Sequence, residues 1–208
     1  MTSMRLPTPI VDRTAFTDKK HRLRTRASAA IDTVVLHQLS YSRGGVVTAY
    51  DTVVAHFVVL LEGHILKLHP IDAYLAASSA LNDYSVSIEF AGNLPNENNY
   101  YWPGNSGRHV PTAEQIASGR DLVRLLNEQY GIGYIHAHRQ GEGVLEERQA
   151  DGRIKKVGHD RTNCPGPDIW YQIGEWAVAE LGMDDGGKDF KEGRGLTIPD
   201  AWRKPRRR

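Results

Sequence analysis

The chain lacks several features that would place it in a broad class of protein. It has a single cysteine, so no disulfide can form within it and the fold requires no oxidising compartment. No apolar run approaches the roughly 20 residues of a membrane-spanning helix. The formal net charge is only +1, which argues against a nucleic-acid-binding surface. We therefore expect no transmembrane segment and no nucleic-acid partner.

What remains is the composition of an ordinary globular protein. Apolar residues make up 40% of the 208 residues and charged residues 25%. This length suits one well-packed domain and is too short for two. The first 26 residues are polar and basic and have no apolar core, so we expect no secretory signal there.

Hydrophobic patterns predict an α/β fold. Apolar or alternating runs predict strands at 31–37, 56–61, 64–69, 85–91 and 134–138, the second and third joined as a hairpin at Glu62-Gly63. A capping box at Thr112 begins one amphipathic helix, and residues 168–181 form another. We predict a single domain with a central mixed β-sheet of four to six strands flanked by helices.

The segments outside these elements define the predicted boundaries. Residues 1–30 are predicted to be an N-terminal arm, on the surface or partly disordered. Residues 31–182 form the domain, with a charged insert at about 140–159. Residues 183–208 form a basic C-terminal tail, for which a solvated state is the default.

Three residues have the chemistry of a metal site. His37 and His138 each end a predicted strand, and Cys164 precedes Pro165 and a helix whose N-terminus favours a thiolate. Two imidazoles and one thiolate suit a catalytic zinc whose fourth position stays open for water. On residue chemistry alone, the alternative is a core cysteine and two unrelated structural histidines.

Five motifs stand in a fixed order along the chain: VVLH ending at His37, HFVV at 56–59, SVSIEFAGN at 85–93, IHAHRQ at 135–140 and RTNCPG at 161–166. The ordered set resembles the zinc-dependent N-acetylmuramoyl-L-alanine amidases of type 2, the family that includes the peptidoglycan recognition proteins and amidase-type phage endolysins. The resemblance covers roughly residues 31–181. It implies that family's fold and Zn²⁺ as the cofactor, with His37, His138 and Cys164 as its ligands.

The resemblance also implies two catalytic roles. The glutamate of the family's Ile-Glu strand motif matches Glu89 and would act as general base. The position two before the third ligand holds Thr162, whose hydroxyl would donate to the developing oxyanion.

Some positions depart from the family pattern. The tyrosine that some members use for catalysis is replaced by Ala55, so we favour the mechanism based on glutamate. The long insert before Cys164 must loop out, and it brings His159 close in sequence as an alternative ligand to His138. His136 alternates with His138 and is predicted to support the metal site from behind its ligands.

A loop at 93–110 is rich in asparagine, glycine, proline and aromatic residues. Tyr101, Trp102 and His109 are its candidate substrate contacts, since rings and hydrogen-bond donors suit a groove for a glycan or a peptide stem. The alternative is that these rings only pack locally.

We therefore predict an enzyme that hydrolyses the amide between N-acetylmuramic acid and L-alanine in peptidoglycan or muropeptides. Two other functions stay open: a recognition protein that binds peptidoglycan without cutting it, and a hydrolase with Cys164 as nucleophile. We expect synthesis in the cytoplasm and action in the cell wall or periplasm after export or lysis. The long ends slightly favour a delivered protein, with a secretion apparatus or an immunity protein as partner.

Overall fold

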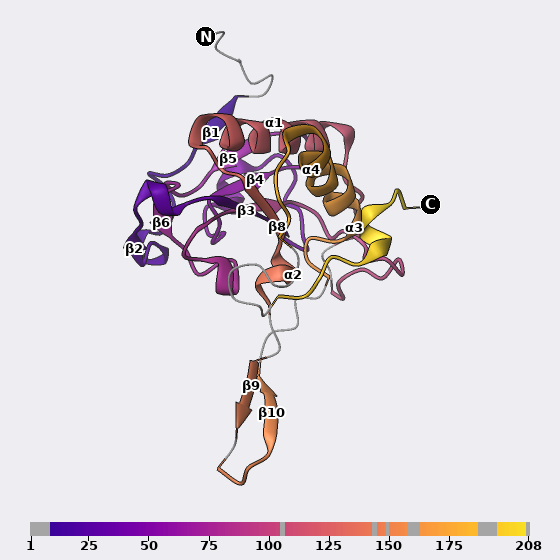
Figure 1. Cartoon of the computed structure of the whole chain (residues 1–208). Coiled ribbons are helices and arrows are strands. Elements are labelled where there is room, and N and C mark those ends of the chain that lie inside the picture. The colour runs from indigo at the N-terminus through magenta and orange to yellow at the C-terminus, as the bar shows by residue number, and fades with distance from the viewer. Residues whose placement is uncertain are drawn as a thin grey trace.

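Figure 1 shows a computed structural model of the chain, which describes residues 9–104, 107–142, 145–148, 150–157, 163–186 and 195–206. Its centre is a six-stranded sheet. The strands lie in the spatial order β1 (Ile10–Asp12), β5 (Ile65–Lys67), β4 (Phe57–Val59), β7 (Ser85–Phe90), β3 (Thr33–Gln38) and β8 (Tyr134–Ala137). Only the β4–β5 hairpin is antiparallel among these neighbours, so the sheet is mixed, as the sequence predicts.

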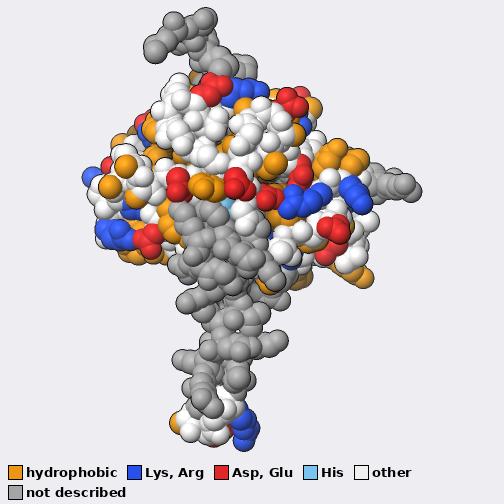
Figure 2. All heavy atoms as spheres, in the orientation of Figure 1, with side chains coloured by type: hydrophobic (Ala, Val, Ile, Leu, Met, Phe, Trp, Pro, Cys, Tyr) orange, Lys and Arg blue, Asp and Glu red, His pale blue; other side chains and the backbone are white. Residues whose placement is uncertain are grey.

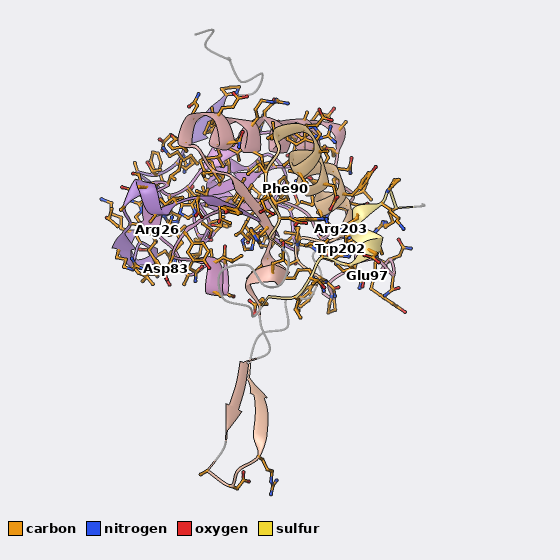
Figure 3. All side chains as sticks on the ribbon, viewed as in Figure 1. Arg26, Asp83, Phe90, Glu97, Trp202 and Arg203 are labelled. Atoms are coloured by element: carbon orange, nitrogen blue, oxygen red, sulfur yellow. The ribbon has the colours of Figure 1, made fainter. Side chains whose placement is uncertain are left out.

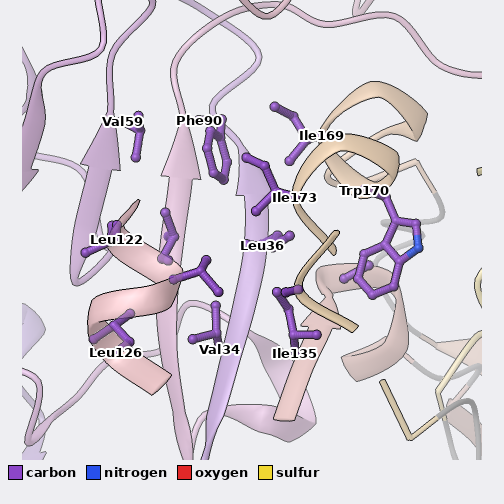
Figure 4. Close-up of a cluster of buried hydrophobic side chains, with 14 of the residues drawn as sticks. Val34, Leu36, Val59, Phe90, Leu122, Leu126, Ile135, Ile169, Trp170 and Ile173 are labelled. Carbon is purple, nitrogen blue, oxygen red and sulfur yellow. The ribbon is translucent and has the colours of Figure 1, made fainter. Parts of the chain in front are cut away.

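Helices pack on one face of this sheet. They are α1 (Ala113–Tyr130) and a continuous helical segment made of α3 (Pro167–Ile169), the π-helical turn η5 (Trp170–Glu175) and α4 (Trp176–Leu181). Figure 4 shows the core between the layers, where Val34 and Leu36 of β3 face Leu122 of α1 and Ile173 of η5. The prediction of a single domain with a mixed sheet and flanking helices is confirmed.

The opposite face of the sheet is covered by shorter elements. A second apolar cluster there contains Tyr50, Val58 and Leu66. The described residues also form the short helical turns η1 (Lys19–His21), η2 (Ser28–Ala30), η3 (Val47–Tyr50), η4 (Ser79–Leu81), α2 (His138–Gly141) and η6 (Asp200–Arg203). The side chains of alternate β3 residues therefore face two different environments. His37, a candidate metal ligand, lies on the side away from the long helices.

Local sequence explains where α1 begins and ends. The Thr112 hydroxyl accepts the backbone N–H of Gln115 at 3.0 Å, as expected for an N-cap. The Gln115 amide, however, donates to the carbonyls of Val59 and Ala91 instead of completing a capping box. Gly131 ends the helix with a φ of 67°, which glycine adopts without strain.

Several predicted boundaries shift by a few residues in the structure, and two of them lie next to candidate site residues. The last strand ends at Ala137, and His138 begins the one-turn helix α2. Gln140 stops the strand because its side-chain oxygen accepts the Ala137 N–H at 2.8 Å. The second helix begins at Pro167 and contains the π-helical turn, which the sequence pattern does not reveal.

The predicted N-terminal arm is part of the packed fold, which corrects the sequence-based boundary at residue 30. Residues 10–12 extend the main sheet, and Arg24–Thr25 (β2) pairs with Ala73–Tyr74 (β6). The Arg26 side chain is buried and donates to the carbonyls of Ile71 and Ser85. Burial lowers the pKa of Arg26 to about 10.

The predicted basic tail is also packed where it is described. Trp202 is fully buried in the main core, together with Ile198. Arg203 donates to Glu175 and Asp185, both at 2.6 Å, so the tail is tied to the helical layer by ion pairs. Figure 3 shows Trp202 and Arg203 on the side of the molecule where the chain ends. The tail is therefore structural over residues 195–206.

The charged insert contains a hairpin of Leu145–Arg148 (β9) and Ile154–Val157 (β10), which extends away from the sheet in Figure 1. This hairpin falls within the predicted insert at about 140–159. On the face shown in Figure 2, acidic and basic side chains of the described residues lie next to one another. No described helix is long and apolar enough to cross a membrane.

Two histidines are buried in the uncharged form. His56 bonds to the Ser87 hydroxyl and the Ala73 carbonyl, and burial lowers its pKa to about 3. Nδ1 of His69 accepts a hydrogen bond from Arg22, and burial lowers the pKa of His69 to about 4. Both pKa values lie below the ordinary value of 6.5. As the pH falls, the unfolded chain therefore binds protons at these histidines before the folded chain does.

We predict that stability is greatest above pH 6.5 and falls as the pH drops toward 4. The linkage relation gives a loss of about 2 kcal/mol for each histidine between pH 7.5 and pH 5. Urea unfolding at the two pH values measures it. His56→Gln and His69→Gln should each remove about half of this difference, whereas His64→Gln, at an exposed position, should leave it unchanged. Equal pH dependence in all four proteins would contradict the assignment.

Candidate metal centre

The parallel strands bring the predicted site residues to one edge of the sheet. His37 lies near the carboxyl end of β3, and its register partner in β7 is Glu89. His138 directly follows β8, the other neighbour of β3. In open α/β sheets, ligand sites form outside the carboxyl ends of parallel strands. Residues far apart in sequence therefore meet at this edge.

His37, His138 and Cys164 form a compact group of donors. One candidate ligand atom from each residue lies within 4.8 Å of the other two. The two imidazole rings are 4.3 Å apart between centroids and tilted by 53°. The residues are 1%, 8% and 9% exposed, respectively. A thiol and two imidazoles are thus gathered at the margin of the core.

Backbone groups fix the position of the cysteine. The Gln38 N–H donates to the Cys164 sulfur at 3.4 Å, an interaction that favours the thiolate. The Arg139 N–H donates to the Cys164 carbonyl at 3.2 Å. Each bond comes from the residue immediately after one of the histidines. The three donors are consequently held by hydrogen bonds as well as by the sheet.

A second layer of side chains contacts the two imidazoles. His37 Nε2 lies 2.9 Å from the Ser78 hydroxyl, and His138 Nε2 lies 3.2 Å from a Glu142 carboxylate oxygen. Ser79 donates to the same Glu142 oxygen. An imidazole with Nε2 engaged by a protein group binds a metal through Nδ1. These contacts engage Nε2 of both rings and so leave Nδ1 of each ring as the candidate metal-binding atom.

The donor set fits zinc. Bonds of about 2.0 Å to nitrogen and 2.3 Å to sulfur place the donors of one tetrahedral zinc roughly 3.5 Å apart. Shifts of about one ångström would bring the three side chains to a common ion. Three protein ligands leave a fourth position, which is the arrangement of catalytic zinc sites. The residues present are therefore suited to hold Zn²⁺.

Glu89 lies beside this donor group. Paired residues of neighbouring strands share a face of the sheet about 4.8 Å apart, so Glu89 is on the same face as His37. Ile88 and Phe90 point into the core under the helices. Burial, and after it the Glu89 carboxylate, raises the pKa of Tyr41 above its ordinary value. A partly buried carboxylate with an adjacent phenol therefore stands next to the first histidine.

Other residues considered in the sequence have different surroundings. Ala55 is fully buried in the second apolar cluster, where it offers no functional group. Fully buried His136 is the register partner of Val35, so it lies on the same face of the sheet as His37. Thr162 and His159 lie outside the described residues.

The predicted substrate loop leaves the same edge of the sheet. Trp102 is 59% exposed, whereas Tyr101 and His109 are partly buried. His109 Nδ1 accepts the Asn93 N–H at 3.1 Å, so this imidazole helps to hold the loop. The structure thus brings the three metal-ligand candidates together and leaves the aromatic loop beside them as a separate surface.

Sequence reasoning missed the residues that support the ligands. They are Gln38, Ser78, Ser79 and Glu142. The last is four residues after His138, a spacing that places two side chains on one helical face. From that spacing, the contact between Glu142 and His138 could have been predicted. The two serines carry none, because they reach the site only through the fold of the segment before β7.

We predict that these supporting contacts set the affinity for zinc. Glu142→Gln and Ser78→Ala should each weaken binding about 10- to 100-fold, the usual effect of losing such a partner. Competition with a chromogenic chelator measures the dissociation constant. Glu62→Gln removes an exposed carboxylate in the β4–β5 turn and should leave binding unchanged. Wild-type affinity in both site variants would show that these contacts do not act on the metal.

The fold is similar to known amidases and recognition proteins. The endolysin N-acetylmuramoyl-L-alanine amidase LysCS of Clostridium intestinale URNW superposes with a TM-score of 0.55 at 18% identity, covering 86% of this chain and 99% of that one. Peptidoglycan recognition protein SA of Apis mellifera gives 0.56 at 16%, covering 81% and 96%. Drosophila peptidoglycan recognition protein SD gives 0.54 at 16%, covering 81% and 95%.

These identities are low, so the superpositions establish the fold alone. No curated protein matches the sequence. The family described as N-acetylmuramoyl-L-alanine amidase, by contrast, matches residues 25–167, a range that includes all three candidate metal ligands and Glu89. By this match, the chain belongs to the N-acetylmuramoyl-L-alanine amidase family Amidase_2.

Proposed function

We propose that this protein is a zinc-dependent amidase that hydrolyses the bond between the lactyl group of N-acetylmuramic acid and L-alanine of the stem peptide. The observation that carries the proposal is the convergence of His37, His138 and Cys164 within 4.8 Å, in a chain of the amidase family. This donor set is that of a catalytic zinc. A peptidoglycan-related substrate follows from the family.

Each residue has a distinct part in this reaction. The two imidazoles and the thiolate would hold the zinc, which when bound would supply Lewis acidity toward the scissile carbonyl and the attacking water. Glu89 takes the proton of the attacking water and delivers it to the leaving amine of L-alanine. Ser78 and Glu142 keep the imidazoles in their ligating orientation. Thr162, outside the described residues, is proposed to donate to the oxyanion.

Glu89 suits this role because of its surroundings. It is flanked by His37 in β3 and by Val58 in β4, and it is partly shielded from water. A carboxylate in such a place can act as a general base toward a water between it and the proposed metal ligands. Glu142, the other carboxylate at the site, is engaged by His138 and Ser79 and so serves the ligand.

Two alternative functions have specific support. Several proteins of similar fold are peptidoglycan recognition proteins. This similarity favours the alternative that the protein binds muropeptide without cutting it. Cys164, a ligand that non-catalytic members of the family commonly lack, favours the enzyme. A cysteine hydrolase would use Cys164 as nucleophile with a nearby histidine as base. The three functions differ in their response to chelators.

Digestion of purified sacculi and of soluble muropeptides, with and without 1,10-phenanthroline, tests the proposal. We predict free stem peptides beginning at L-alanine by mass spectrometry, their loss with the chelator, and their return when zinc is added. Cys164→Ala should be inactive under all conditions. Cleavage that survives the chelator would establish the cysteine hydrolase. Binding of muropeptide without any cleavage would establish the recognition protein.

Glu89→Gln separates the general base from the metal. We predict that kcat falls about 10²- to 10⁴-fold, the usual contribution of a general base. Zinc affinity should stay at the wild-type value, because Glu89 is not among the predicted ligands. The comparison variant is Glu62→Gln, with unchanged kcat. A kcat within a factor of two of wild type, with zinc bound, would exclude Glu89 as the base.

The proposed site of action is the cell wall or periplasm, reached by export or by lysis of the producing cell. A secretion apparatus or an immunity protein is the expected partner of a delivered enzyme. Fractionation of the producing cells tests this proposal. If all of the amidase stays in the cytoplasm and acts only on small muropeptides, the protein would instead be an enzyme of peptidoglycan recycling.

A further inference from the structure

The loop between β7 and α1 presents a group of aromatic side chains to solvent. Tyr100 is 73% exposed and Trp102 59% exposed. With Tyr101 and Arg108 they form what we call the aromatic platform, which lines a cavity of about 600 Å³. Exposed apolar area costs roughly 25 cal/mol per Å², and clustered exposed rings commonly mark binding sites.

Buried hydrogen bonds hold the platform in place. Asn93, 1% exposed, donates through its amide to the carbonyls of Trp102 and Gly107 at 2.8 and 2.9 Å. The Trp102 N–H donates back to the Asn93 side-chain oxygen at 2.9 Å. Asn96 in turn accepts the Tyr100 N–H at 3.0 Å. The rings are exposed, but the backbone that carries them is fixed, which lowers the entropic cost of binding a ligand.

The C-terminal segment supports the base of the same loop. The indole N–H of buried Trp202 donates to Glu97 at 3.2 Å. Arg206 donates to the Asn96 carbonyl at 3.0 Å and lies 3.5 Å from the buried Asp168 carboxylate. Figure 3 shows Glu97 and Trp202 close together. The loop is therefore held from both its sheet side and its tail side.

One residue joins the platform to the metal centre. Gln38 donates its backbone N–H to the Cys164 sulfur, and its side-chain oxygen accepts the Leu94 N–H at 3.0 Å. Leu94 directly follows the anchor Asn93. Asn93 is four positions after Glu89 in the chain, so their Cα atoms are at most about 14 Å apart. A ligand on the platform would thus be near a substrate at the metal centre.

The chemistry of the platform favours a sugar. Trp and Tyr rings offer flat apolar faces with a polar group at one end, which suits the C–H faces and hydroxyls of a pyranose ring. The guanidinium of Arg108 lies 5.3 Å from the Tyr101 ring, and the Asn99 amide adds a second polar group. Arg108 is the sole charged side chain among the described lining residues, so the platform lacks the several cationic groups that a nucleic-acid backbone requires.

We propose that the aromatic platform is a saccharide subsite, which binds a sugar of the glycan strand next to the muramoyl residue whose amide is cleaved. This inference rests on the proposed function and adds a substrate preference to it. The enzyme would act preferentially on substrates that keep their glycan. A lactyl-peptide without sugars would lack the contacts of the platform.

The test is binding of a peptide-free tetrasaccharide of alternating N-acetylglucosamine and N-acetylmuramic acid, followed by calorimetry and by the indole N–H resonance of Trp102. We expect saturable binding, weakened about tenfold or more in Trp102→Ala and in Tyr100→Ala. Trp102→Phe keeps a stacking face and should retain most of the affinity. Tyr130→Ala, which removes a half-exposed ring at the end of α1, should bind as wild type.

Two results would overturn the subsite. One is the absence of tetrasaccharide binding to the wild-type protein, or binding that is equally strong in the Trp102→Ala variant, with that variant folded by circular dichroism. The other is displacement of the tetrasaccharide from Trp102 by a free stem peptide or an oligonucleotide, which would identify a different ligand.

The saccharide has no scissile amide, so this experiment is independent of hydrolysis. Amidase activity without tetrasaccharide binding would overturn the subsite and leave the proposed function standing. Tetrasaccharide binding without amidase activity would leave the saccharide subsite standing and overturn the proposed amidase function. In an active enzyme, Trp102→Ala should raise KM for glycan-bearing substrate with little change in kcat, because the platform contacts no reacting atom.

Discussion

The site depends on the parallel register of three neighbouring strands. Strand β3 lies between β7 and β8 and is parallel to both, so the carboxyl ends of all three meet at one edge. This register sets Glu89 beside His37 and starts α2 with His138 at the same edge. Cys164 comes from a distant part of the chain, and the backbone N–H of Gln38 holds its sulfur there. A metal would bind donors that the sheet has already gathered.

A second constraint is the packing of the C-terminal segment against the loops of the site. The guanidinium of Arg139, the residue after a proposed ligand, lies 5.1 Å from the buried Trp202 ring. The Leu196 N–H donates to the Arg139 carbonyl, and Trp202 also bonds to the aromatic loop. The same segment therefore stabilises the metal centre and the proposed saccharide subsite, which links the two surfaces mechanically.

Sequence predicted the parts of the fold that have a strong periodic pattern. The buried runs of β3 and β7 and the capped helix α1 are examples, because burial of one face leaves a regular apolar spacing. Order along the chain, with the family resemblance, indicated the candidate ligands. Strand β1 and buried Trp202 were missed, since a three-residue strand and a single tryptophan in a charged tail have no period. Ser78 meets His37 through tertiary structure alone.

X-ray absorption at the zinc edge of the zinc-loaded protein tests the central claim most directly. We predict one zinc per chain, with two nitrogen neighbours at about 2.0 Å, one sulfur at about 2.3 Å and one further light atom. The sulfur shell should disappear in Cys164→Ser. A spectrum of the wild-type protein without a sulfur neighbour, or zinc bound equally well by a His37→Ala, Cys164→Ser double variant, would contradict the assignment of these residues as the metal centre.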